Sequence, residues 1–291
     1  MPNFTIELDE RERYGFHASD YGKMGLELYF AFKKVPQSNP VRWNETLKWG
    51  AGKGVELQML KVLKDSGVVP LDYDQDKEPV VVVEREGVQV FTHKDAVNFN
   101  GEPIEIKSIN NKNAIDIKKY ADGNPRENYV GQLAIYMDSL GKDRGYMFVA
   151  SVDGLSYFWL ECNRLEGRRF QCGQVIVDLD KEYQRWAEIK KHVENDIEPD
   201  PFEFGRYKLS PKEVDWSSLS VATISAVRAG KKVIGDPEAW RILYSPWKDE
   251  IIKRQGVRPG YSEEELAEIR EITKGFSTKK NDKRLIGRDV E

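Results

Sequence analysis

The chain of 291 residues carries 45 Lys and Arg against 49 Asp and Glu, which gives a net charge of −4 at pH 7. Hydrophobic residues make up 40% of the sequence and aromatic residues 11%, which is enough for a packed core and excludes a globally disordered chain. The mild negative charge argues against a protein that coats polyanions without selectivity, although a local basic surface can lie beside an acidic site.

Cysteine content and hydropathy exclude further classes of protein. Cys162 and Cys172 are too few for a disulfide framework or for a site of four thiolates. The first residues are charged and lack the apolar segment of a secretory signal. No apolar run approaches the length of a membrane span. We therefore expect a cytoplasmic protein with no membrane partner.

The first third of the chain predicts two helices followed by a pair of strands. Residues 18–34 have apolar and aromatic side chains at helical spacing, and Ser19 is placed to cap the N-terminus of that helix. A second helix is expected at residues 47–66. Residues 79–85 and 87–93 are rich in Val and predict strands joined by a tight turn.

The segment that follows, as far as Lys107, predicts a β-hairpin whose register decides which side chains share a face. With a two-residue loop, Asp95 would face away from Glu105. A three-residue loop at residues 100–102 instead pairs Asp95 with Lys107. That register places both residues on the face that carries Glu105. We expect the longer loop, because three-residue loops with Gly in the left-handed region are common hairpin closures.

The remaining elements alternate between helix and strand as far as a proline-containing segment. Residues 125–141 and 180–195 predict helices. Residues 144–151 and 156–162 predict strands between them. The prolines of residues 196–205 indicate a boundary. Beyond this boundary the chain is more helical and leans basic.

Asp95, Glu105 and Lys107 place two acids and a base on one strand face, which packing alone does not require. Two carboxylates and the backbone carbonyl of Ile106 suit a hard cation such as Mg²⁺ or Mn²⁺. Lys107 beside them could orient a water or stabilise charge that develops on a phosphoryl oxygen. The alternative is an exposed ion pair on a strand, which stabilises by less than about 1 kcal/mol.

Two other segments carry residues that suit the same chemistry. Glu56 lies in the second predicted helix behind three glycines and offers a third acid, with a solvated helix position as the alternative. Gln132 and Tyr136 lie four residues apart on one helical face, with Tyr129 a turn earlier. An amide and phenols on that face suit contact with a phosphate or a base edge, and half-buried packing is the alternative.

Taken in order, these residues resemble the motifs of the PD-(D/E)XK nuclease superfamily, and specifically its RecB-like branch. That branch has an acidic or His residue on an early helix, then Asp, then Glu-x-Lys, then Gln-x-x-x-Tyr. The resemblance covers residues 15–165 and is carried by the ordered set of motifs. Glu56 is a departure, since many relatives have His there, but a carboxylate also suits the metal. The matching positions are Glu56, Asp95, Glu105-Ile106-Lys107 and Gln132-Leu-Ala-Ile-Tyr136.

The resemblance implies an α/β (α+β) fold in which a mixed central β-sheet is flanked by helices, with a restriction-endonuclease-like core. It also implies a deoxyribonuclease that depends on Mg²⁺ or Mn²⁺. Glu56, Asp95 and Glu105 would bind the metal together with the backbone carbonyl of Ile106. Lys107 would assist the attacking water.

DNA contacts are expected from residues around this metal site. The resemblance implies that Gln132 and Tyr136 position the DNA, with Tyr129 beside them. His93 lies two residues before Asp95 and could touch a metal-bound water or a phosphate, and a structural hydrogen bond is the alternative. Further along the chain, the basic residues that could track a DNA backbone, or else form a solvated helix end, are Arg228, Lys231 and Lys232.

Some members of the branch hold an iron–sulfur cluster with one Cys near the N-terminus and three near the C-terminus. Residues 240–251 resemble the C-terminal element with its cysteines replaced, because Ile242, Ser245 and Ile251 keep a C-x2-C-x5-C spacing. Met24 takes the N-terminal position. Without thiolates at these positions no iron–sulfur cluster can bind. This pattern is interpreted as a lost cluster, with chance similarity as the alternative.

The expected organisation has two parts. Residues 1–205 form a nuclease core with N-terminal helices, and residues 206–291 form a helical region that packs back on it. A capping box at Ser262 and Glu265 predicts one helix in this region. About the last 15 residues have little to bury and are expected to be mobile.

We expect a phage-type DNA exonuclease that acts on the ends of single- or double-stranded DNA in recombination, repair or replication. Proteins of recombination or replication would be further partners, in the host cytoplasm if a phage encodes the chain. The alternatives are a structure-specific or restriction-type endonuclease and an inactive DNA-binding module. Three retained acids argue against the last, because a cation relieves their mutual repulsion.

Overall fold

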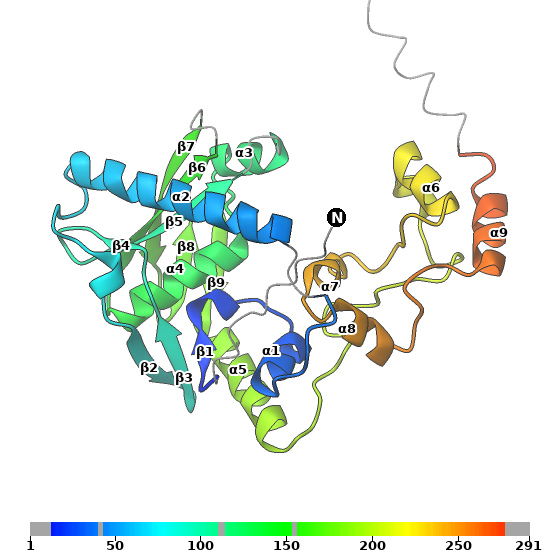
Figure 1. Cartoon of the computed structure of the whole chain (residues 1–291), viewed down its shortest axis with the longest axis horizontal. Coiled ribbons are helices and arrows are strands. Elements are labelled where there is room, and N and C mark those ends of the chain that lie inside the picture. The colour runs from blue at the N-terminus through cyan, green and yellow to red at the C-terminus, as the bar shows by residue number, and fades with distance from the viewer. Residues whose placement is uncertain (1–12, 40–42, 110–113, 153–155, 277–291) are drawn as a thin grey trace, which may run out of the picture. The chain divides into compact units, whose positions relative to one another are not determined.

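The computed structural model describes residues 13–39, 43–109, 114–152 and 156–276 (Figure 1). The chain forms two compact units, one of residues 1–35 and 40–199 and the other of residues 36–39 and 200–291. The helices are α1 (Gly25–Phe32), α2 (Trp43–Asp65), α3 (Ala114–Ala121), α4 (Glu127–Ser139), α5 (Leu179–Glu194), α6 (Val221–Arg228), α7 (Trp240–Tyr244), α8 (Lys248–Arg254) and α9 (Glu263–Ile272). The strands are β1 (Phe16–His17), β2 (Val81–Arg85), β3 (Val88–Thr92), β4 (Ala96–Val97), β5 (Pro103–Ile109), β6 (Arg144–Ser151), β7 (Tyr157–Arg164), β8 (Arg169–Cys172) and β9 (Val175–Asp178).

A mixed six-stranded sheet forms the centre of the first unit, with strand order β4-β5-β6-β7-β8-β9. β5 and β6 run parallel, and the other neighbouring strands of this sheet run antiparallel. A second sheet of three strands has the order β1-β3-β2. The predicted α+β class, with a mixed sheet flanked by helices, is confirmed.

α2 packs on one face of the six-stranded sheet, at β5. Ile104 and Ile106 of β5 belong to the same buried cluster as Leu60 of α2. Side chains alternate along a strand, so Glu105 and Lys107 point to the opposite face. Glu105 and Lys107 of the predicted pattern therefore lie on the face of β5 away from the α2 core.

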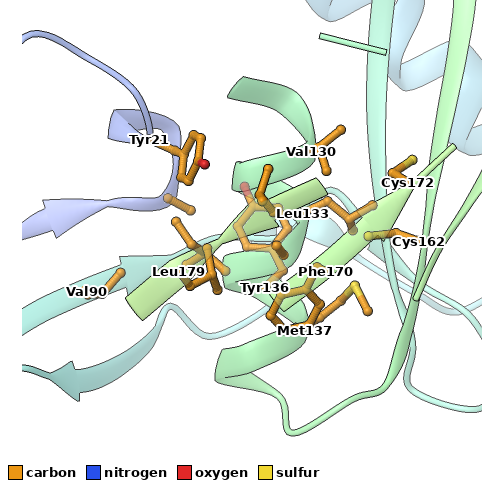
Figure 2. Packing of buried hydrophobic residues seen from close by; sticks show 14 of the residues in the cluster. Tyr21, Val90, Val130, Leu133, Tyr136, Met137, Cys162, Phe170, Cys172 and Leu179 are labelled. Atoms are coloured by element: carbon orange, nitrogen blue, oxygen red, sulfur yellow. The ribbon is translucent and has the colours of Figure 1, made fainter. Parts of the chain in front are cut away.

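α4 packs on that opposite face and forms the centre of the main core. Its buried residues Leu133 and Met137 share a cluster with Met147 of β6. Figure 2 shows Leu133, Tyr136 and Met137 of α4 together with Phe170 of β8. Helices predicted at 47–66, 125–141 and 180–195 correspond to α2, α4 and α5, and strands predicted at 79–85, 87–93, 144–151 and 156–162 correspond to β2, β3, β6 and β7.

The first predicted helix, at residues 18–34, is wrong in its N-terminal half. The first three of these residues form a 3-10 turn, and α1 begins only at Gly25. Met24, rather than Ser19, is the residue at its N-cap. The physical reason is Gly22, whose φ of 68° lies in the left-handed region and interrupts any right-handed helix.

The predicted hairpin register is also wrong, although the two acids do share a face. β4 pairs with β5 so that Ala96 lies opposite Ile104. One step back in this register, Asp95 lies opposite Glu105 rather than Lys107. A shift of two residues keeps every side chain on its original face, whereas a shift of one would reverse it.

The hairpin loop spans five residues, 98–102, because the side chain of Asn98 organises a wider turn. Asn98 Oδ1 accepts hydrogen bonds from the backbone N–H of Asn100 at 2.9 Å and of Glu102 at 3.0 Å. Gly101 takes a φ of 70° in this turn. An Asn that bonds to the backbone two residues later is a typical turn former.

The second unit is helical, and α6 and α9 pack against each other in it. Val227 and Ile269 are fully buried between them. Ser262 and Glu265 form the predicted capping box of α9. The positions that keep the spacing of the cluster motif, Ile242, Ser245 and Ile251, are buried. Packing of this region on the core stays a prediction, and the segment expected to be mobile, residues 277–291, lies outside the described residues.

Candidate active site

Asp95 lies directly before β4 and is held by the backbone of the neighbouring strand. Its Oδ2 accepts a hydrogen bond from the N–H of Ile106 at 2.8 Å. The N–H and C=O of one strand residue project from the same edge of the strand. The Ile106 carbonyl therefore lies on the same edge as Asp95, where the sequence predicted a backbone ligand.

Glu105 is fully buried, with 0% of its surface exposed. Its Oε1 forms an ion pair with Lys107 Nζ. Its Oε2 is buried and has no hydrogen-bond donor among the residues that the structure describes. Lys107 Nζ also lies over the ring of Tyr129, 5.2 Å from its centroid, which limits where the ammonium can move. One carboxylate oxygen of the site is thus left without a protein partner.

Burial is the largest cause that raises the pKa values of Asp95 and Glu105. Burial, followed by the charge of Asp95, raises the pKa of Glu105 to about 8. Burial also raises the pKa of Asp95 to about 6, and the charge of Glu56 adds to this rise. Burial lowers the pKa of Lys107, but Glu105 and Asp95 more than offset it, so its pKa lies above the ordinary value. The site therefore favours additional positive charge.

The Gln75 side chain, which was not among the predicted site residues, connects Glu56 of α2 to Asp95. Gln75 is 6% exposed, and its Nε2 donates to Glu56 Oε1 at 3.1 Å and to Asp95 Oδ1 at 3.5 Å. Lys53, one turn before Glu56 on α2, lies with its Nζ 2.6 Å from the same Glu56 oxygen. Gln75 lies in a short 3-10 turn with no periodicity or motif around it, so no signal in the sequence identifies it.

The predicted DNA-contacting residues on α4 lie against the acids. Gln132 Nε2 donates to the hydroxyl of Tyr136 at 2.6 Å. Tyr136 is buried, and burial followed by the charges of Glu105 and Asp95 raises its pKa well above the ordinary value. The phenol is therefore held neutral beside the carboxylates, and Gln132 is the more accessible of the two side chains.

The donor set fits a hard cation bound by two carboxylates. Among the described residues, no three side chains of His, Cys, Asp or Glu converge in an arrangement that would hold a metal ion. Mg²⁺ is commonly bound through one or two carboxylates together with water and substrate phosphates. Asp95, Glu105 and the Ile106 carbonyl match that pattern, and the unpaired Oε2 of Glu105 is the oxygen that a cation would satisfy.

The other predicted residues lie apart from this cluster or in the second unit. His93 is exposed, and within the described part of the chain it makes no hydrogen bond or ion pair with the three acids. Arg228 Nε donates to Thr273 Oγ1 at 2.7 Å within the second unit. Lys231 and Lys232 are exposed beyond the end of α6. Their contact with DNA stays a prediction.

Comparison with known proteins does not assign a family to the chain. No family model matches the chain, and no curated protein matches it. Among solved structures, the crystal structure of SSO0001 is similar with a TM-score of 0.41 and 16% identity, over 73% of this chain and 88% of that one. An alkaline exonuclease, LHK-Exo from Laribacter hongkongensis, is similar with a TM-score of 0.39 and 16% identity, over 63% of this chain and 90% of that one. At these scores neither likeness assigns a family or an activity. In the described part of the chain, no helix is long and apolar enough to cross a membrane.

Proposed function

We propose that the chain is a DNA exonuclease that depends on Mg²⁺ or Mn²⁺ and hydrolyses phosphodiester bonds in recombination, repair or replication. The observation that carries the proposal is Glu105, a fully buried carboxylate with an unpaired oxygen beside a second acid and a lysine. Burial keeps this carboxyl protonated up to a pKa of about 8, and a cation beside it would satisfy the free oxygen and stabilise the ionised form. The ordered motifs that resemble RecB-like nucleases favour a metal ion as that cation.

The residues of the site divide into metal ligands and groups that act on the reacting water. Asp95, Glu105 and the Ile106 carbonyl would hold the cation, whose chemistry there is to polarise a phosphodiester and lower the pKa of a bound water. Lys107 is positively charged and fixed over Tyr129, so it can orient that water or stabilise charge on a phosphoryl oxygen. Gln132 would contact the DNA.

A second candidate function is an inactive DNA-binding module. It is favoured by the failure of Glu56 to converge with the other two acids in the described residues. Against it, such a module has no use for a carboxyl whose burial, together with the charge of Asp95, raises its pKa to about 8. A structure-specific or restriction-type endonuclease would use the same residues and differs only in the DNA that it accepts.

The test is degradation of end-labelled linear DNA and closed-circular DNA in Mg²⁺, Mn²⁺ or EDTA. Wild type is compared with Lys107→Ala and with Lys118→Ala, which removes an exposed ammonium paired with Asp122 on α3. We expect metal-dependent loss of linear DNA only, absent in Lys107→Ala and retained in Lys118→Ala. Cutting of the circle would indicate an endonuclease, and DNA binding without any cleavage would indicate the inactive module.

A further inference from the structure

Lys53 is a second ammonium in the site, in addition to the lysine of the Glu-x-Lys pattern. Its Nζ lies 2.6 Å from Glu56 Oε1 and 3.2 Å from Gln75 Oε1. The Gln75 amide closes a ring by donating to the same Glu56 oxygen at 3.1 Å. Glu56 Oε1 is therefore held by one ammonium and by one amide that also donates to Asp95.

The charges around the acids show what Lys53 does in this arrangement. Lys107 pairs with Glu105, and Lys53 pairs with Glu56. The charge of Lys53 also lowers the pKa of Asp95, so Lys53 acts electrostatically on Asp95 as well as on Glu56. The protein thus supplies from α2 the positive charge that a divalent cation would bring to Glu56. Glu56 Oε1 cannot pair fully with the Lys53 ammonium and bind a divalent metal ion at the same time.

The surroundings of Lys53 leave it free to move, in contrast to Gln75. The Lys53 side chain is 51% exposed and has a flexible stem, whereas Gln75 is 6% exposed. An ammonium at the border of the site can turn toward solvent, where a nucleic acid backbone would pass. The buried amide would stay in place and keep Glu56 oriented.

We propose that Lys53 is a built-in counter-ion that occupies Glu56 in the metal-free protein, leaves it when a divalent cation binds, and then contacts a phosphate of the substrate strand. This inference rests on the proposed function, because it assumes that the cation held by Asp95 and Glu105 is also bound by Glu56. It assigns Lys53 to substrate binding and Gln75 to positioning Glu56. A purely structural lysine would instead make an ordinary helix ion pair, with no effect on cation or DNA affinity.

The first measurement is the affinity for Mn²⁺, monitored by electron paramagnetic resonance. It compares wild type with Lys53→Met, Lys53→Arg and Lys61→Met. Lys61 pairs with Asp65 on the exposed side of α2 and serves as the matched control. We expect Lys53→Met to bind Mn²⁺ about two- to fivefold more tightly, since the cation no longer has to break an exposed ion pair. Lys53→Arg and Lys61→Met should stay close to wild type.

The second measurement is binding of a labelled DNA duplex in Mn²⁺ at several salt concentrations, in a Lys107→Ala background so that the DNA stays intact. Loss of one phosphate contact should weaken binding by Lys53→Met and reduce the slope of log affinity against log salt by about 0.7 to 0.9. Lys53→Arg should have the DNA affinity and the salt dependence of wild type.

The outcomes separate the inference from the proposed function. Tighter Mn²⁺ binding with weaker DNA binding by Lys53→Met supports the inference. Unchanged or weaker Mn²⁺ binding, with wild type binding well, overturns it and leaves the proposed function standing. Tighter Mn²⁺ binding without any change in DNA binding overturns the phosphate contact. No Mn²⁺ binding by wild type refutes the proposed function, and the inference with it.

Discussion

Replacing Glu105 with Gln removes the most deeply buried carboxyl of the site, and its effect on stability should depend on pH. Unfolded, Glu105 ionises near its ordinary pKa of 4.5, whereas in the folded protein the pKa is about 8. Below pH 4.5 the carboxyl is neutral in both states and contributes no difference. Between pH 4.5 and 8 the folded state keeps a proton that the unfolded state releases, so stability falls by up to about 1.4 kcal/mol per pH unit.

Above pH 8 the full penalty of a buried Glu105 carboxylate is on the order of 5 kcal/mol. The pKa of about 8 already includes the attraction of Lys107 for the Glu105 carboxylate, so the loss of that ion pair in the Gln variant is not a further cost. The neutral amide takes the place of the protonated carboxyl. The metal-free Glu105→Gln variant should therefore be more stable than wild type by up to about 5 kcal/mol at pH 9, and equal to it below pH 4.5.

The assay is urea unfolding in EDTA at pH 4.5 and pH 9, with tryptophan fluorescence as the probe of unfolding. Glu161→Gln, at an exposed position on β7, is the matched control and should be neutral at both pH values. A Glu105→Gln variant that is destabilised at pH 9, or that differs from wild type equally at both pH values, would refute the reasoning. Adding Mn²⁺ at pH 9 should stabilise wild type and leave Glu105→Gln nearly unchanged.

Four further predictions concern the site, the core around it and an open position on α2. Mn²⁺ affinity should rise about tenfold or more from pH 6 to pH 8, because protons on the two strand acids compete with the cation; a paramagnetic resonance titration that finds no pH dependence would contradict this. Gln75→Leu should weaken Mn²⁺ binding about tenfold, since two acids lose their amide donor, and an unchanged affinity would show that the amide is dispensable. Gly131→Ala should lower stability by about 2 kcal/mol or more in thermal unfolding, because a Cβ there would lie 2.2 Å from the ring of Tyr21. Gly54→Ala on α2, where a Cβ meets nothing within 4 Å, should instead stabilise by about 0.5 to 1 kcal/mol.

Much of the fold could be predicted because its signals are local. The Val-rich strands β2 and β3 and the amphipathic α4 carry their periodicity in consecutive residues. The break before α1 was missed because one glycine, Gly22, outweighs the helical spacing on both sides of it. The register of the hairpin was missed because it depends on a single side chain, Asn98, whose bonds widen the loop.

The site was predictable only where its residues follow one another along a strand. Glu105 and Lys107 share a face by strand geometry, which needs no tertiary information. Gln75 joins Glu56 to Asp95 only after three separate segments have packed together, and its amide could equally have faced solvent. The burial that raises the Glu105 pKa likewise comes from α4, which lies about 30 residues further along the chain than β5.

The parallel pairing of β5 with β6 has a consequence for how the protein folds. Parallel neighbours need a long crossover, and here the chain passes through α3 and α4 before β6 returns beside β5. Such non-local contacts form late, after the entropy of closing the loop has been overcome. A growing or truncated chain that ends before α4 can form the β4–β5 hairpin, but it lacks the helix that packs over Glu105. The two neighbouring carboxylates therefore lose their solvent only in a chain whose α4 core has closed, so that folding itself delays formation of the buried centre.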